Sequence, residues 1–283
     1  MIMRELYGDK KMALVVIDAQ RKFRSDRPDW DQVRDAAVTR MNRLLFMFRQ
    51  AGAPVIVVRY EGKTRCRPYE GTDGDEYFPG LVILPTDRVV TKHSMNSFRD
   101  TELEGVLKSM DVDKILLCGT VTQYCVMSTY YSAMDHDITP YLAHDATIST
   151  TQDILKAAEV VCKTLEEDYV AEVLGVPQIP DGEVPVVVPN VVADWDSGLI
   201  PVIAALANSK GGHFMVGYPK GVKDNVKLAR SIIEQVKEEL GIEIETEAIT
   251  FCAHDSVDVT VRAMENPVVL GGQKFTARLG YGY

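Results

Sequence analysis

The stretch that decides the fold is Met12-Ala13-Leu14-Val15-Val16-Ile17, followed directly by Asp18. This run is apolar throughout, is rich in β-branched residues and contains no alternating polar positions. Such a pattern is typical of a strand that is buried on both faces, as the strands of a parallel sheet are. The start of the chain therefore predicts an α/β fold.

Strand patterns and helix patterns then alternate. The next helix has apolar residues at spacings of three and four, at Val33, Ala37, Met41, Leu44 and Phe48. Further strands are expected at 55–58, 88–91, 114–118, 139–143 and 170–174, with helices near 103–110, 123–134 and 154–165. This order predicts a doubly wound, six-stranded parallel sheet with helices on both faces.

A change of composition marks a domain boundary. Residues 175–185 read GVPQIPDGEVP, and this density of proline and glycine is typical of a linker. We therefore expect one domain over residues 1–176, which carries the six-stranded sheet, and a small α/β domain over 177–283. In the second domain the pattern predicts strands at 184–192, 214–216 and 243–252 and helices at 194–208 and 222–240. We expect it to serve oligomerisation or to cap a substrate site.

The composition excludes several classes of protein. Across 283 residues, 31 Lys and Arg stand against 41 Asp and Glu, so the net charge of −10 argues against a nucleic-acid partner. No apolar stretch approaches the roughly 20 residues of a membrane helix, and the first residues lack the pattern of a signal peptide. The five cysteines are odd in number and form no CxxC pair, which argues against a disulfide framework. A cytoplasmic protein is expected.

Three reactive side chains come at the ends of predicted strands. Asp18 follows the first strand, Lys92 the third, and Cys125 comes after the fourth, at the start of a helix. The carboxyl ends of parallel strands meet at one edge of a sheet, so these groups are expected to converge there. A helix N-terminus and a nearby ammonium can lower a thiol pKa to about 3.5–7.5. A neighbouring carboxylate can accept the thiol proton. By contrast, Cys118 and Cys162 lie on apolar faces and are expected to be small buried residues.

Three longer motifs surround these residues in the same order. Residues 16–20 read VIDAQ and precede Phe23, residues 90–98 read VTKHSMNSF, and residues 117–126 read LCGTVTQYCV. A later segment, residues 143–146, reads AHDA. From about residue 12 to 174 the chain resembles the isochorismatase-like cysteine hydrolase superfamily, which includes N-carbamoylsarcosine amidases and nicotinamidases.

The resemblance implies a catalytic triad. Cys125 is the expected nucleophile, Asp18 the general base and acid, and Lys92 the residue that holds both and favours the thiolate. A cis peptide bond is expected between Thr120 and Val121. The backbone amides of Val121 and Cys125 would then form the oxyanion hole.

Substrate contacts are expected from two places. Gln20 and Phe23 of the first motif are assigned to substrate binding. Arg65 and Arg67 lie in a basic segment, residues 59–69, that could hold an anionic group, although a solvated loop explains this segment equally well.

The chain departs from nicotinamidases at the metal. The resemblance implies metal-binding histidines in the loop after the second strand, but residues 60–85 contain no histidine. We therefore expect no metal and no cofactor.

These points predict a cysteine hydrolase that cleaves an amide or ureido C–N bond of a small molecule through a thioester. The alternatives are a non-catalytic ligand-binding or assembly module on a hydrolase fold, and a metal-dependent nicotinamidase. A homo-oligomer is expected, without nucleic-acid or membrane partners.

Overall fold

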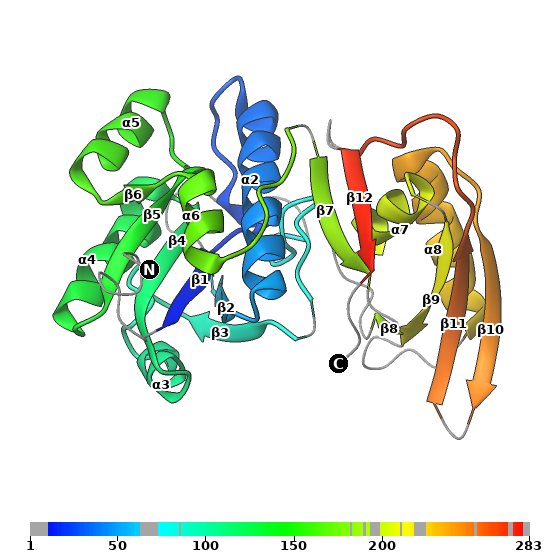
Figure 1. Cartoon of the computed structure of the whole chain (residues 1–283), viewed down its shortest axis with the longest axis horizontal. Coiled ribbons are helices and arrows are strands. Elements are labelled where there is room, and N and C mark those ends of the chain that lie inside the picture. Colours follow the sequence, from blue (N-terminus) through cyan, green and yellow to red (C-terminus); the bar gives the residue numbers. More distant parts are fainter. Residues whose placement is uncertain are drawn as a thin grey trace. The chain divides into compact units, whose positions relative to one another are not determined.

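The computed structural model describes residues 11–62, 73–84, 86–181, 183–188, 191–192, 199–209, 211–217, 225–251, 254–270 and 274–279. The chain divides into two compact units (Figure 1). The first comprises Met1–Phe78 and Asp87–Gln178, and the second comprises Pro79–Thr86 and Ile179–Tyr283.

The first unit is built on a six-stranded sheet in which all neighbouring strands are parallel. The strand order is β3-β2-β1-β4-β5-β6. The strands are β1 (Lys11–Ile17), β2 (Val55–Tyr60), β3 (Arg88–Lys92), β4 (Val112–Thr120), β5 (Thr139–Ile148) and β6 (Thr164–Leu165). The predicted doubly wound sheet is therefore confirmed.

One predicted strand is wrong. Residues 170–174 belong to helix α6 (Glu167–Leu174), and the sixth strand is the two-residue β6. A short apolar run fits a buried strand and a helical turn equally well. The two acidic residues of the first turn and the left-handed Gly175 that ends the helix favour the helix here.

Helices cover both faces of this sheet (Figure 1). They are α2 (Trp30–Gln50), α3 (Leu103–Ser109), α4 (Met127–Asp135), α5 (Gln152–Val161) and α6. Ala13, Val15 and Ile17 of β1 share one core with Val106 of α3 and Tyr130 of α4. The alternate side chains of β1 face the opposite side, where α2 contacts β1 and β5.

The sheet order brings the ends of β1, β3 and β4 to one edge. There, β4 passes very close to β1. Gly119 has a φ of +110°, and a Cβ at this position would lie 2.0 Å from the carbonyl oxygen of Ile17. Only glycine permits this approach, which leads the chain directly into the segment that contains Cys125.

The second unit has a four-stranded sheet, in the order β10-β11-β9-β8, and a two-stranded parallel sheet of β12 and β7. Its strands are β7 (Glu183–Val188), β8 (Val191–Val192), β9 (Gly212–Gly217), β10 (Glu245–Phe251), β11 (His254–Val261) and β12 (Lys274–Leu279), with helices α7 (Leu199–Ala207) and α8 (Asn225–Leu240). A smaller C-terminal α/β unit is thus present. The single strand expected over 184–192 is two strands in different sheets, and β11 and β12 were not expected.

An early segment of the chain belongs to the second unit. Val82 lies in the same core as Phe214, Val257 and Phe275, and Leu81 is fully buried. The predicted division at residue 176 does not include this segment, and the domain boundary itself remains a prediction. Among the described residues, no helix has the length and apolar character needed to cross a membrane.

We expect a chain truncated after Leu174 to self-associate, because the buried Leu81, Val82 and Ile83 belong to the second unit, most of which the truncation removes. The same truncation with all three residues replaced by serine should stay monomeric and keep its helical signal. Size-exclusion chromatography and circular dichroism measure both. A monomeric, stable chain without the serine substitutions would show that this segment does not depend on the second unit.

Candidate functional site

Asp18 begins the site at the end of β1. Its φ is 48°, in the left-handed region that aspartate and asparagine tolerate better than most residues. Its backbone amide donates to the carbonyl of Val58, and its own carbonyl accepts from the amide of Gln20 at 2.7 Å. The side chain is fully buried.

Lys92, the last residue of β3, pairs with this carboxylate. Its Nζ lies 2.7 Å from Asp18 Oδ2, and both side chains have zero exposure. The same Nζ donates to the carbonyl of Met95 at 3.0 Å. The turn that carries Met95 is attached to α4 through a buried pair of hydroxyls, since Thr129 Oγ1 donates to Ser97 Oγ at 2.8 Å. The ammonium is therefore fixed in a preorganised position.

Cys125 lies between β4 and α4, in the π-helix Thr122–Val126. The Thr120–Val121 peptide bond is cis, as expected. The carbonyl of Val121 accepts from the amides of Tyr124 and Val126. Thr122 fastens this turn to β5 through a 3.0 Å hydrogen bond to Thr147. Cys125 is buried, with 5% exposure.

The structure brings the carboxylate, the ammonium and the thiol together. The Cys125 thiol interacts with both Asp18 and Lys92. Both carboxylate oxygens of Asp18 are buried, and neither has a hydrogen bond of standard geometry within the described part of the chain; Oδ2 lies in the ion pair with Lys92. The thiol is the neighbouring donor from which this carboxylate can take a proton.

The electrostatics correct one sequence-based expectation. The pKa of Cys125 is raised to about 12, not lowered, because burial and the negative charge of Asp18 outweigh the effect of Lys92. Burial also raises the pKa of Asp18, and the charge of Lys92 offsets only part of this increase. The site therefore pairs a neutral thiol with a carboxylate whose pKa is raised.

The residues expected to bind substrate have different placements. Gln20 is fully buried, and its amide is engaged with the backbone. Its Oε1 accepts from the amide of Tyr60 at 2.9 Å, while its Nε2 donates to the carbonyls of Tyr60 and Asp75. Gln20 thus positions the end of β2. Phe23 is half-buried with its ring edge-on to Tyr60, and Arg65 and Arg67 lie outside the described residues.

Sequence reasoning missed Lys22, which lies inside the first motif. Its side chain is only 6% exposed, and its ammonium donates to the carbonyl of Tyr60 at 2.7 Å and to Asp75. Its charge opposes the increase in the pKa of Asp18. The signal in the sequence was a lysine in a helical turn directly after a buried strand, between Gln20 and Phe23.

Three acidic residues of the segment 73–76, which follows β2, are engaged in ion pairs. Asp73 and Glu76 lie 2.6 Å and 3.5 Å from Arg21, and Asp75 pairs with Lys22. Arg21 and Lys22 thus tie the segment after β2 to the end of β1.

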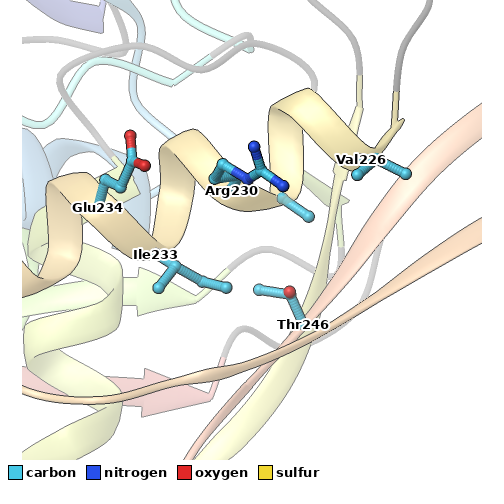
Figure 2. Close-up of a pocket in the computed structure, with 6 residues that line it drawn as sticks. Val226, Arg230, Ile233, Glu234 and Thr246 are labelled. Carbon is cyan, nitrogen blue, oxygen red and sulfur yellow. The ribbon is translucent and has the colours of Figure 1, made fainter.

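A separate hollow of about 460 Å³ lies in the second unit. Figure 2 shows its lining from α8 and β10: Val226, Ala229, Arg230, Ile233, Glu234 and Thr246. This lining contains no thiol, imidazole or pair of carboxylates. It is therefore a poor candidate for a catalytic site.

Comparisons with known proteins agree with this geometry. An isochorismatase domain model matches residues 12–175. The isochorismatase family protein YddQ of Bacillus subtilis is 31% identical over 144 residues, which cover 50% of this chain and 80% of that protein. Streptothricin hydrolase of Streptomyces noursei is 34% identical over 136 residues, which cover 47% of this chain and 53% of the hydrolase.

Solved structures show the same fold. An isochorismatase family protein from Desulfovibrio vulgaris has a TM-score of 0.52 at 22% identity, covering 59% of this chain and all of that one. A cysteine hydrolase from Pseudomonas syringae has a TM-score of 0.51 at 21% identity, covering 58% and 92%. With its matching domain model and six-stranded sheet, this chain belongs to the isochorismatase family.

Proposed function

We propose that this chain is a cysteine hydrolase that cleaves an amide or ureido C–N bond of a small molecule through a thioester. The observation that carries the proposal is the buried Asp18–Lys92 ion pair beside the thiol of Cys125. A carboxylate within reach of a protonated thiol is the arrangement that nucleophilic catalysis by cysteine requires.

The first half of the reaction follows from the protonation states. Asp18 accepts the proton of Cys125 as its Sγ attacks the carbonyl carbon, so that no standing thiolate is needed. The negative charge passes to the carbonyl oxygen, where the amides of Val121 and Cys125 stabilise it. Asp18 then gives the proton to the departing nitrogen, and the C–N bond breaks to leave a thioester.

The second half uses the same groups in reverse. Water attacks the thioester carbonyl while Asp18 takes a proton from it. The thiolate that leaves is reprotonated, and a carboxylic acid is released. Throughout, Lys92 holds the Asp18 carboxylate in place and keeps a positive charge beside the exchanging proton.

The relatives support hydrolysis and leave the substrate open. Streptothricin hydrolase is named for hydrolysis of a compound, and the chain covers about half of its length. The nicotinamidase alternative would place metal-binding histidines in the loop after β2, and residues 60–85 contain none. The non-catalytic alternative is disfavoured, because the chain would then keep the buried Asp18–Lys92 ion pair, which costs stability, without any catalytic use for it.

We expect Cys125→Ala and Asp18→Asn each to reduce turnover by about three orders of magnitude or more, and the double variant to be little worse, since both act in one step. Cys162→Ala is the matched control, because Cys162 has the same 5% exposure as Cys125. The assay is ammonia release from nicotinamide, carbamoyl amino acids, biuret and ureido acids. Near-normal turnover by Cys125→Ala would refute the assignment.

The acidic limb of the pH profile of kcat/KM should lie above the ordinary aspartate pKa of about 3.9. Asp18 must be ionised to accept the thiol proton, and burial raises its pKa, so activity is lost as the pH falls through that raised value. Lys22→Gln removes a nearby positive charge and should move this limb to higher pH.

Arg27→Gln is the control for this shift, because Arg27 is not among the groups that perturb Asp18. If Lys22→Gln left the acidic limb in place, or moved it to lower pH, Asp18 would not be the group that titrates.

The ion pair should also be visible in stability. Asp18→Asn and Lys92→Met should each cost about 3–5 kcal/mol of unfolding free energy, because each leaves the partner buried and unpaired. Asparagine is the appropriate replacement, as it tolerates the left-handed backbone of residue 18. The double variant should recover much of the loss. Urea denaturation of the wild type, both single variants and the double variant measures these unfolding free energies. If the loss in the double variant equalled the sum of the two single losses, the two side chains would not be energetically coupled.

A further inference from the structure

The Lys92 ammonium is held in part by a carbonyl group outside its own strand. Its Nζ lies 2.7 Å from Asp18 Oδ2, donates to the carbonyl of Met95 at 3.0 Å, and also interacts with the thiol of Cys125. Met95 lies beyond the end of β3, in a segment without regular helix or strand, and its side chain is 58% exposed. Neither strand pairing nor burial of its own side chain therefore fixes the carbonyl that holds the ammonium.

Helix α4 holds this segment instead. Thr129 is fully buried and uses its hydroxyl group in two directions, because it accepts from the backbone amide of Ser97 at 3.1 Å and donates to Ser97 Oγ at 2.8 Å. Nearby on α4, Ser132 Oγ accepts from Asn96 Nδ2 at 3.0 Å. The two contacts reach the segment one and two residues after Met95, so they act directly on the turn that presents its carbonyl.

Apolar packing alone would not orient that carbonyl. Phe98 ends the segment in the same core as Tyr130, and this contact fixes how deep the segment lies. Burial of apolar surface is non-directional, whereas a hydrogen bond depends strongly on the angle at which its donor and acceptor meet. The direction of the Met95 carbonyl therefore depends on the hydrogen bonds from α4.

The same helical run carries the nucleophile. Cys125 lies in the π-helix Thr122–Val126, which leads directly into α4, and Thr129 follows it by four residues. Side chains at this spacing lie on the same side of a helix, and both are buried here. One helical run thus places the thiol through its own backbone and the ammonium through a single threonine hydroxyl.

We propose that Thr129 is a positioning residue of the active site, whose hydroxyl group holds the turn after β3. Through this turn, the Met95 carbonyl keeps the Lys92 ammonium beside the carboxylate and the thiol. The inference rests on the proposed function, to which it adds a residue that acts through Lys92 and not on the reacting atoms.

Loss of the hydroxyl group should weaken the influence of the ammonium on both of its neighbours. The charge of Lys92 lowers the pKa of Asp18 and that of Cys125, so both values should rise when the ammonium is displaced. A residue that merely stabilised the fold would change the free energy of unfolding and leave these two pKa values in place.

Thr129→Val removes the hydroxyl group and keeps the shape of the side chain. It leaves the buried amide of Ser97 unpaired, so a loss of stability is expected in any case. The positioning role predicts in addition that the acidic limb of kcat/KM moves up by about half a pH unit or more. It also predicts that kcat falls by up to about 100-fold. Thr129→Ser keeps the hydroxyl group and should restore both values.

Alkylation of Cys125 by iodoacetamide tests the same inference without a substrate. The thiolate is the reactive form, so at a fixed pH Thr129→Val should slow the reaction by about threefold or more, which corresponds to half a pKa unit. Thr129→Ser should react as the wild type does. In a Lys92→Met chain, Thr129→Val should leave the rate unchanged, because the ammonium through which it acts is absent. Peptide mapping by mass spectrometry separates Cys125 from the other cysteines.

A Thr129→Val chain that kept the wild-type alkylation rate would overturn the proposal, even if it were less stable. Equal slowing with and without Lys92 would do the same, as would a Thr129→Ser chain that behaved like Thr129→Val. If Lys92→Met did not fold, the comparison of valine with serine would still decide. If the wild type hydrolysed none of the tested compounds, the proposed function would fail, while the alkylation rates would still determine the role of Thr129.

Discussion

Burial of the Asp18–Lys92 ion pair is the constraint on which the first unit depends. Two charges that lie 2.7 Å apart and have no exposure cannot rely on water for stabilisation, so the surrounding chain must supply every contact. The sheet order meets this demand, because β1 and β3 end at the same edge and β2 lies between them. Gln20 fixes the end of β2, and the Ser97–Thr129 pair fixes the turn after Lys92.

The same burial determines how the cysteine can react. In exposed sites a neighbouring cation commonly gives a standing thiolate. Here desolvation has the largest effect on the pKa of Cys125, and the negative charge of Asp18 raises this pKa further, so that together they outweigh the effect of Lys92. In the mechanism that we propose, the neutral thiol gives its proton to the Asp18 carboxylate only as the carbonyl group of a bound substrate accepts the negative charge.

The sequence was informative where one physical rule dominated. Apolar strands that end at Asp18 and Lys92 reveal the parallel sheet and two site residues together, because topology brings strand ends to one edge. It was less informative where two outcomes fit the same residues. Residues 170–174 suit both a strand and a helix, and the Gln20 amide could bind either substrate or backbone. The sign of the Cys125 pKa shift depends on how deeply the thiol is buried, which no motif encodes. Likewise, nothing near Leu81 marks it as a residue of the second unit.

The placement of Pro79–Thr86 in the second unit has a consequence for the order of events during synthesis. This segment leaves the ribosome long before Phe214, Val257 and Phe275, which complete the core that contains Val82. Most of the first unit is made in between. The nascent chain therefore carries Val82 without this core while the sheet around β1 assembles, and the later strands β9, β11 and β12 supply the residues that bury it. The second unit thus closes around a piece of chain that was made near the beginning.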